Sequence, residues 1–141
     1  MIVYLDTSAL VKLFMDEPET QRITRLLQGA GAVFTHTITY AELRAALAKA
    51  VRMQRITDTT HRDYKAALEV YWQNLDLIEL NMIRIRQAGE FAETFGLRGY
   101  DSVHLAAAAW LFEQSVPLTF ACFDHHLNKA ASALGMETIV Q

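Results

Sequence analysis

The chain has 141 residues and a mass of 15.9 kDa, which fits one domain and leaves little room for a second. Its 52% hydrophobic and 21% charged residues exclude a disordered chain, and Cys122 as the single cysteine excludes an internal disulfide and a zinc site built on several thiolates. The net charge of −3 argues against nucleic-acid binding by bulk electrostatics, and no apolar run approaches the ~20 residues that cross a bilayer. We therefore expect one domain over residues 1–141, cytoplasmic and without membrane contact.

Short apolar runs alternate with longer helical patterns along the whole chain. In chain order we expect a strand at 2–5, helices at 7–15 and 18–28, a strand at 32–35, helices at 40–54 and 60–74, a strand at 75–80, helices at 83–95 and 102–113, a strand at 118–122, a helix at 125–134 and a strand at 137–140. Strands separated by helices pair in parallel, with helices on both faces. The pattern predicts a three-layer α/β/α sandwich with a mainly parallel central sheet.

Four acidic residues fall at strand-to-helix junctions or in the first turns of helices. Asp6 ends the first strand, and Asp124 ends the strand at 118–122. Asp101 opens the alanine-rich helix, and Glu42 lies in the first turn of the helix after the second strand. Since ligands of open parallel sheets bind at the carboxyl ends of the strands, we expect these side chains to converge.

The acids have two interpretations. As helix caps, Asp6, Asp101 and Asp124 would bind free backbone N–H groups, and Glu42 would form a capping box with Thr39. As a cluster, two carboxylates ~5 Å apart would repel by about 3 kcal/mol at an effective dielectric of ~20. A hard cation such as Mg²⁺ or Mn²⁺ relieves that repulsion and supports phosphoryl chemistry. The combination favours a metal site.

The same residues carry a family resemblance that spans essentially the whole chain. The segment from Tyr4 to Lys12 (YLDTSALVK) resembles the opening of PIN domains of the VapC type, the toxins of toxin–antitoxin pairs. The segments Tyr40-Ala41-Glu42 with Arg44, RGYDSVHLA from Arg98 to Ala106, and Phe123-Asp124 match later motifs of that family in order.

The resemblance implies a Mg²⁺- or Mn²⁺-dependent endoribonuclease that hydrolyses RNA phosphodiester bonds. Its catalytic residues would be Asp6, Glu42, Asp101 and Asp124. Asp6, Asp101 and Asp124 would bind the metal, and Glu42 would hold or deprotonate a water. The resemblance also implies RNA as substrate, a cognate antitoxin as partner and a homodimer.

Several alternatives stay open at this point. The chain is also compatible with a non-catalytic PIN-fold interaction module, or with a PIN nuclease of RNA processing. The basic stretch from Arg44 to Lys65 is either a solvated helical face or a track for RNA phosphates. Thr7 or Ser8 could contact a phosphate or simply begin a helix. His104, three residues after Asp101, could hydrogen-bond that carboxylate or pack beneath the site.

Overall fold

The computed structural model describes residues 1–114 and 117–139. In chain order its elements are β1 (Ile2–Leu5), α1 (Thr7–Leu10), the 3-10 helix η1 (Val11–Leu13), α2 (Thr20–Gln28), β2 (Ala32–His36), α3 (Ile38–Arg52), α4 (Asp58–Trp72), β3 (Asp76–Ile78), α5 (Met82–Phe95), α6 (Gly99–Phe112), β4 (Leu118–Ala121), α7 (His125–Ala133) and β5 (Glu137–Thr138). No helix within the described residues is both long and apolar enough to span a membrane.

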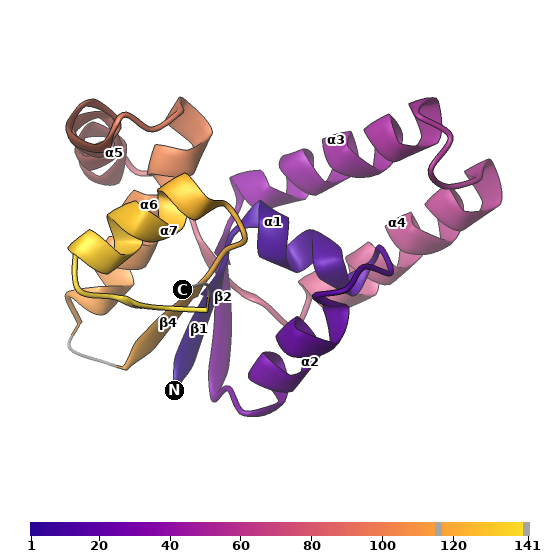
Figure 1. Ribbon diagram of the computed structural model, residues 1–141, viewed down its shortest axis with the longest axis horizontal. Helices are drawn as coiled ribbons and strands as arrows, with labels where there is room; N and C mark the ends of the chain where they lie inside the picture. The colour runs from indigo at the N-terminus through magenta and orange to yellow at the C-terminus, as the bar shows by residue number, and fades with distance from the viewer. Residues whose placement is uncertain (115–116, 140–141) are drawn as a thin grey trace.

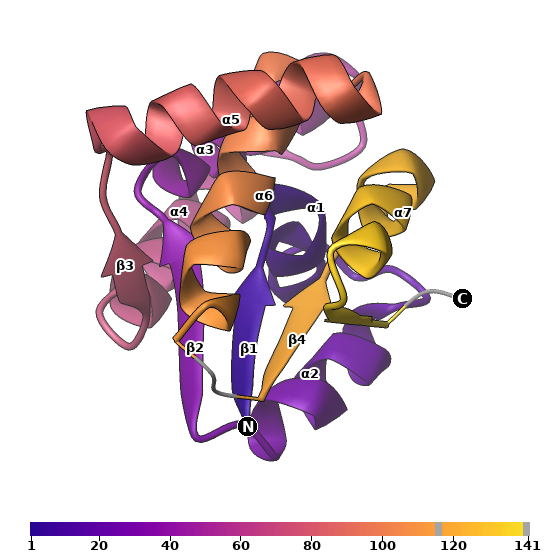
Figure 2. The ribbon, with the colours of Figure 1, turned by 90° about the vertical axis from the view of Figure 1, so that its left-hand side faces the viewer.

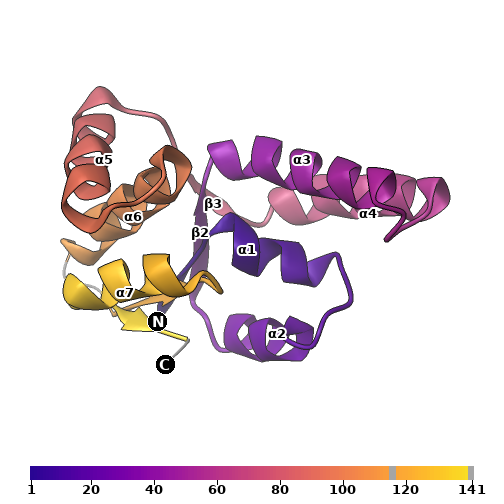
Figure 3. The same ribbon diagram turned by 45° about the horizontal axis from the view of Figure 1, so that its top comes forward.

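The five strands form one sheet in the order β3-β2-β1-β4-β5. Neighbouring strands pair in parallel, and Val3 at the centre pairs with Val33 on one side and Thr119 on the other. Helices α5, α6 and α7 cover one face, while α1 to α4 lie on the other (Figures 1 and 3). The predicted three-layer sandwich with a parallel sheet is confirmed.

Alternate residues of β1 supply the two halves of the core. The ring of Tyr4 stacks on that of Phe120 with centroids 5.7 Å apart, on the face covered by α6 and α7; Figure 2 views this face. Val3 and Leu5 point to the opposite face and pack among residues of α1 to α4. Because the central strand is buried on both faces, its sequence is apolar throughout rather than alternating.

The first helix is shorter than the expected 7–15. Helix α1 ends at Leu10, and the chain tightens into η1, as helix ends often do. The hydroxyl of Thr20 then donates to the carbonyls of Lys12 and Met15, at 2.8 and 3.2 Å. These bonds hold the turn between η1 and α2.

Helix α6 begins three residues earlier than expected. Gly96 ends α5 with a left-handed φ of 65°, which only glycine adopts without cost. Arg98 is extended and α6 starts at Gly99, so the predicted break over 96–99 is shorter than expected. The last strand, expected at 137–140, ends at Thr138, and Val140 lies outside the described residues.

Helices α3 and α4 form a hairpin that projects beyond the sheet (Figures 1 and 3). Thr57 caps α4 by accepting from the backbone N–H of Thr60 at 3.1 Å, so this helix starts at Asp58 rather than at 60. The basic residues Arg44 and Arg52 are exposed on α3. Arg55 in the connecting turn instead forms an ion pair with Glu17 at 3.6 Å.

Candidate functional site

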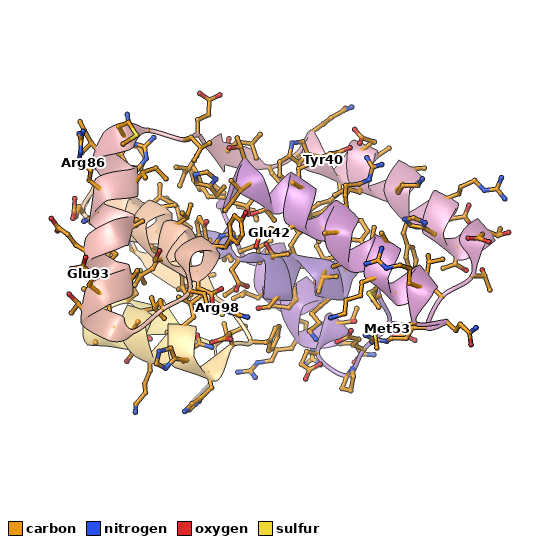
Figure 4. All side chains as sticks on the ribbon, turned by 90° about the horizontal axis from the view of Figure 1, so that it is seen from above. Tyr40, Glu42, Met53, Arg86, Glu93 and Arg98 are labelled. Atoms are coloured by element: carbon orange, nitrogen blue, oxygen red, sulfur yellow. The ribbon has the colours of Figure 1, made fainter. Side chains whose placement is uncertain are left out.

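Strand order explains how the acids come together. β1 and β4 are neighbours, so Asp6 directly after β1 and Asp124 after β4 leave the same edge of the sheet. Glu42 lies in the second turn of α3, which follows β2, and Asp101 lies in the first turn of α6. Figure 4, seen from above this edge, shows Glu42 near the centre of the molecule with Arg98 close by.

Asp6 is buried at the end of β1. Its Oδ1 accepts from the backbone N–H of Ala9 at 3.0 Å and from the hydroxyl of Ser8 at 2.7 Å, so it does cap α1. The Ser8 hydroxyl also accepts from the backbone N–H of Phe123 at 2.9 Å, which ties the end of β1 to the loop after β4. Burial raises the pKa of Asp6 even though His104 and these hydrogen bonds oppose the shift. A nearby cation would therefore stabilise its charged form.

Glu42 is held by two side chains through a single oxygen. Its Oε1 accepts from the Thr7 hydroxyl at 2.7 Å and lies 2.7 Å from Nε2 of His104. Burial by itself disfavours the charge of Glu42, but the hydrogen bonds from His104 and Thr7 leave its pKa lowered. Glu42 is therefore a carboxylate kept ionised inside a half-buried site.

Asp101 and Asp124 share one cationic partner. Nε of Arg98 lies 3.1 Å from Oδ2 of Asp101, and its Nη2 lies 4.0 Å from Oδ2 of Asp124. Asp124 also caps α7 by accepting from the backbone N–H of Leu127 at 2.9 Å. The Arg98 side chain is 82% exposed, so water screens both pairs and the guanidinium can leave them at little cost.

The capping interpretation is wrong for two of the four acids. Asp101 is the third residue of α6, whose capping residue is Arg98, and it does not occupy the capping position. Thr39 lies inside α3 with its hydroxyl 2.8 Å from that of Thr35, so it does not form the expected capping box with Glu42. The bond from His104 to Asp101, one of its two expected roles, does not form, because the ring turns toward Glu42.

The donor set suits a hard divalent cation. All the candidate ligands are carboxylates, and the guanidinium of Arg98 shows that Asp101 and Asp124 together attract a cation. Within residues 1–114 and 117–139, no group of three His, Cys, Asp or Glu side chains is arranged so that it could hold a metal ion. Mg²⁺ usually takes only one or two carboxylates and keeps several waters, so an open site of this kind fits it.

Two residues of the site had no role assigned from sequence. Arg98 stands three positions before Asp101, and this i, i+3 spacing is a signal for an ion pair at a helix start. Tyr4 gave no signal, because it occupies an ordinary buried strand position. Its hydroxyl lies 2.7 Å from Nδ1 of His104, one hundred positions away in the chain.

Comparison with known proteins is consistent with this geometry. Residues 3–132 match the PIN domain family model, and the chain belongs to the PIN domain family. It is 34% identical over 134 residues to Ribonuclease VapC45 of Mycobacterium tuberculosis, a match covering 95% of this chain and 92% of that protein.

Solved structures share the fold at lower identity. VapBC2 from Rickettsia felis, bound to a DNA fragment from their promoter, aligns with a TM-score of 0.67 at 18% identity, over 99% of this chain and 100% of that one. The sarcin–ricin loop cleaving toxin VapC20 of M. tuberculosis aligns with a TM-score of 0.66 at 16% identity, over 95% of each chain. At these identities the likeness concerns the fold.

Proposed function

We propose that this chain is an endoribonuclease dependent on Mg²⁺ or Mn²⁺, acting as the toxin of a toxin–antitoxin pair. The observation that carries the proposal is that Asp6 and Asp124 follow neighbouring parallel strands and that Arg98 links Asp124 to Asp101. Neither Asp101 nor Glu42 caps a helix. The near full-length similarity to a protein named as a ribonuclease supports the same activity.

The four acids have two different parts in the proposed reaction. Asp6, Asp101 and Asp124 are the proposed metal ligands, and Arg98 must release the last two for the metal to bind. A divalent cation held there would screen the charge of the phosphodiester and acidify the attacking water. Glu42, ionised and anchored, is placed to accept the proton of that water.

The proposed substrate is RNA, and the proposed partners are a cognate antitoxin and a second copy of the chain. They rest on the resemblance to VapC-type toxins. The exposed cations of the α3–α4 hairpin offer a surface for RNA phosphates beside the site. We place the activity in the cytoplasm, where RNA is present and where an antitoxin would be made together with the toxin.

The test is cleavage of labelled RNA with Mn²⁺, with Mg²⁺ and with a chelator, using wild type, Asp6→Asn and Asp101→Asn. Asparagine still caps a helix, so the Asp6 variant keeps α1 intact while losing the charge. We expect the cleavage rate of each variant to fall by at least about 100-fold, a loss typical of removing transition-state charge stabilisation. Asp63→Asn, which removes an exposed acid from α4, is the control and should cleave normally. Equal cleavage by wild type and both site variants would refute the proposal.

A further inference from the structure

A chain of side-chain hydrogen bonds runs from the core of the sheet to the site. It starts at the Tyr4 hydroxyl on β1, passes through the ring of His104 on α6 and reaches Glu42 on α3. The ring lies 2.7 Å from both of these partners and 3.3 Å from the Thr7 hydroxyl, which itself donates to Glu42 at 2.7 Å. Tyr4 and His104 are buried, so neither meets a substrate directly.

The direction of these bonds follows from the hydroxyl of Tyr4. Tyr4 is fully buried, so its phenol proton needs an acceptor, and Nδ1 of His104 lies within reach at 2.7 Å. With Nδ1 accepting, the neutral ring carries its own proton on Nε2 and donates it to Glu42.

The two oxygens of Glu42 are consequently unequal. Thr7 and His104 both bind Oε1, and no hydrogen bond within the described part of the chain engages Oε2. The side chain is 26% exposed, so the carboxylate reaches solvent while one oxygen stays anchored. An anchored Oε1 sets the direction in which Oε2 points.

We propose that Tyr4 and His104 are positioning residues that fix Glu42 through Oε1 and leave Oε2 as the oxygen that takes the proton of the attacking water. Tyr4 selects the ring tautomer of His104, and His104 holds the carboxylate. The role assigned to Oε2 rests on the proposed nuclease function. The tautomer and the anchoring of Oε1 do not.

The tautomer is tested first, on the metal-free full chain, by nitrogen-15 NMR of the histidine rings. His104 is assigned by the signal that disappears in His104→Gln. We expect the Nε2–H tautomer in wild type, a mixture of tautomers in Tyr4→Phe, and no change in the control Tyr64→Phe. A ring protonated on Nδ1 in wild type, or a pattern that Tyr4→Phe leaves unchanged, would overturn the inference whether or not the protein cleaves RNA.

A matched pair of variants then tests the anchoring of Glu42. In His104→Gln the side-chain amide nitrogen stands near the position of Nε2 and can still donate to Glu42. In His104→Asn the shorter amide can meet Tyr4 only, and Glu42 keeps only the hydrogen bond from Thr7. We expect kcat for RNA cleavage to fall about 10- to 100-fold in His104→Asn and much less in His104→Gln, with KM little changed in either.

Thermal melts separate this role from simple packing. If His104 only fills space, kcat in the two variants will fall alike or follow their melting temperatures, and the positioning role is overturned. If wild type itself does not cleave RNA with metal, the proposed function fails. The ring tautomer then still decides whether Tyr4 and His104 orient Glu42.

Discussion

Acidification should weaken the fold through His36, at the end of β2. The side chain is 3% exposed, and its Nδ1 accepts from the backbone N–H of Ile38 at 3.0 Å. Burial is the main cause that lowers the pKa of His36 from 6.5 to about 4, and repulsion from Arg84 acts in the same direction. Protonation would also set a ring N–H against the N–H of Ile38, so the charged ring is disfavoured by geometry as well as by burial.

The size of the effect follows from the two pKa values. Below about pH 6.5 the unfolded chain binds this proton and the folded protein does not, so stability present at pH 7 is lost as the pH falls toward 4. Each pKa unit is worth 1.36 kcal/mol, and the cost to the free energy of unfolding reaches about 2 kcal/mol by pH 4.5.

The assay is urea unfolding at pH 7 and at pH 4.5, for wild type and His36→Asn. The asparagine oxygen can still accept from Ile38 but does not titrate, and any cavity it leaves is present at both pH values. We expect wild type to lose about 2 kcal/mol more than the variant between the two pH values. Equal losses would show that the fold does not resist protonation of His36, and the lowered pKa of this ring would be refuted.

Three further predictions concern the site, the turn at Gly96 and the basic surface of α3. Arg98→Gln should tighten Mn²⁺ binding in a calorimetric titration, because it removes a cation that competes for Asp101 and Asp124. The gain should be only a few-fold, because water screens both ion pairs. Gly96→Ala should lower the free energy of unfolding by about 1 kcal/mol, since a side chain is strained at φ 65°. Arg44→Gln combined with Arg52→Gln should reduce the slope of log affinity for single-stranded RNA against log salt by about 1.4, at ~0.7 for each phosphate that is no longer neutralised.

Each of these has a control in the same chain. Arg86→Gln removes an equal charge from α5, away from Glu42 in Figure 4, and should leave Mn²⁺ affinity unchanged. Gly99→Ala places a side chain in open space at the start of α6 and should be nearly neutral. Arg22→Gln with Arg25→Gln tests whether α2 contributes to the salt slope as much as α3 does. The first prediction is contradicted if Arg98→Gln leaves Mn²⁺ affinity unchanged, and the second if Gly96→Ala leaves the free energy of unfolding unchanged. The third is contradicted if the two double arginine variants show the same slope of log affinity against log salt.

Much of the architecture was predictable because its signals are local. An apolar run of four residues ending in an acid, followed by a helical pattern, is contained in about a dozen consecutive positions around Asp6. The same holds for the strand before Asp124. Once the strands are taken as parallel, their carboxyl ends share one edge, and the convergence of the acids follows without coordinates.

Element boundaries were less predictable, because distant side chains compete for the terminal backbone groups. The expected helix over 7–15 is divided into α1 and η1, and Thr20, which begins α2, holds the following turn through the carbonyls of Lys12 and Met15. Helix α6 starts early because Gly96 alone, in a left-handed conformation, turns the chain. Gly99 is therefore free to join the helix.

The sequence by itself thus determined the fold class, the placement of Asp6 and Asp124 after strands and the family resemblance. Only the tertiary structure decided the partners of those acids: Arg98 across Asp101 and Asp124, and the Tyr4–His104 pair behind Glu42. The reason is physical. Tyr4 and Glu42 reach His104 across 100 and 62 positions of chain, and a hydrogen bond over such a separation exists only when packing of the sheet and helices sets its atoms within about 3 Å.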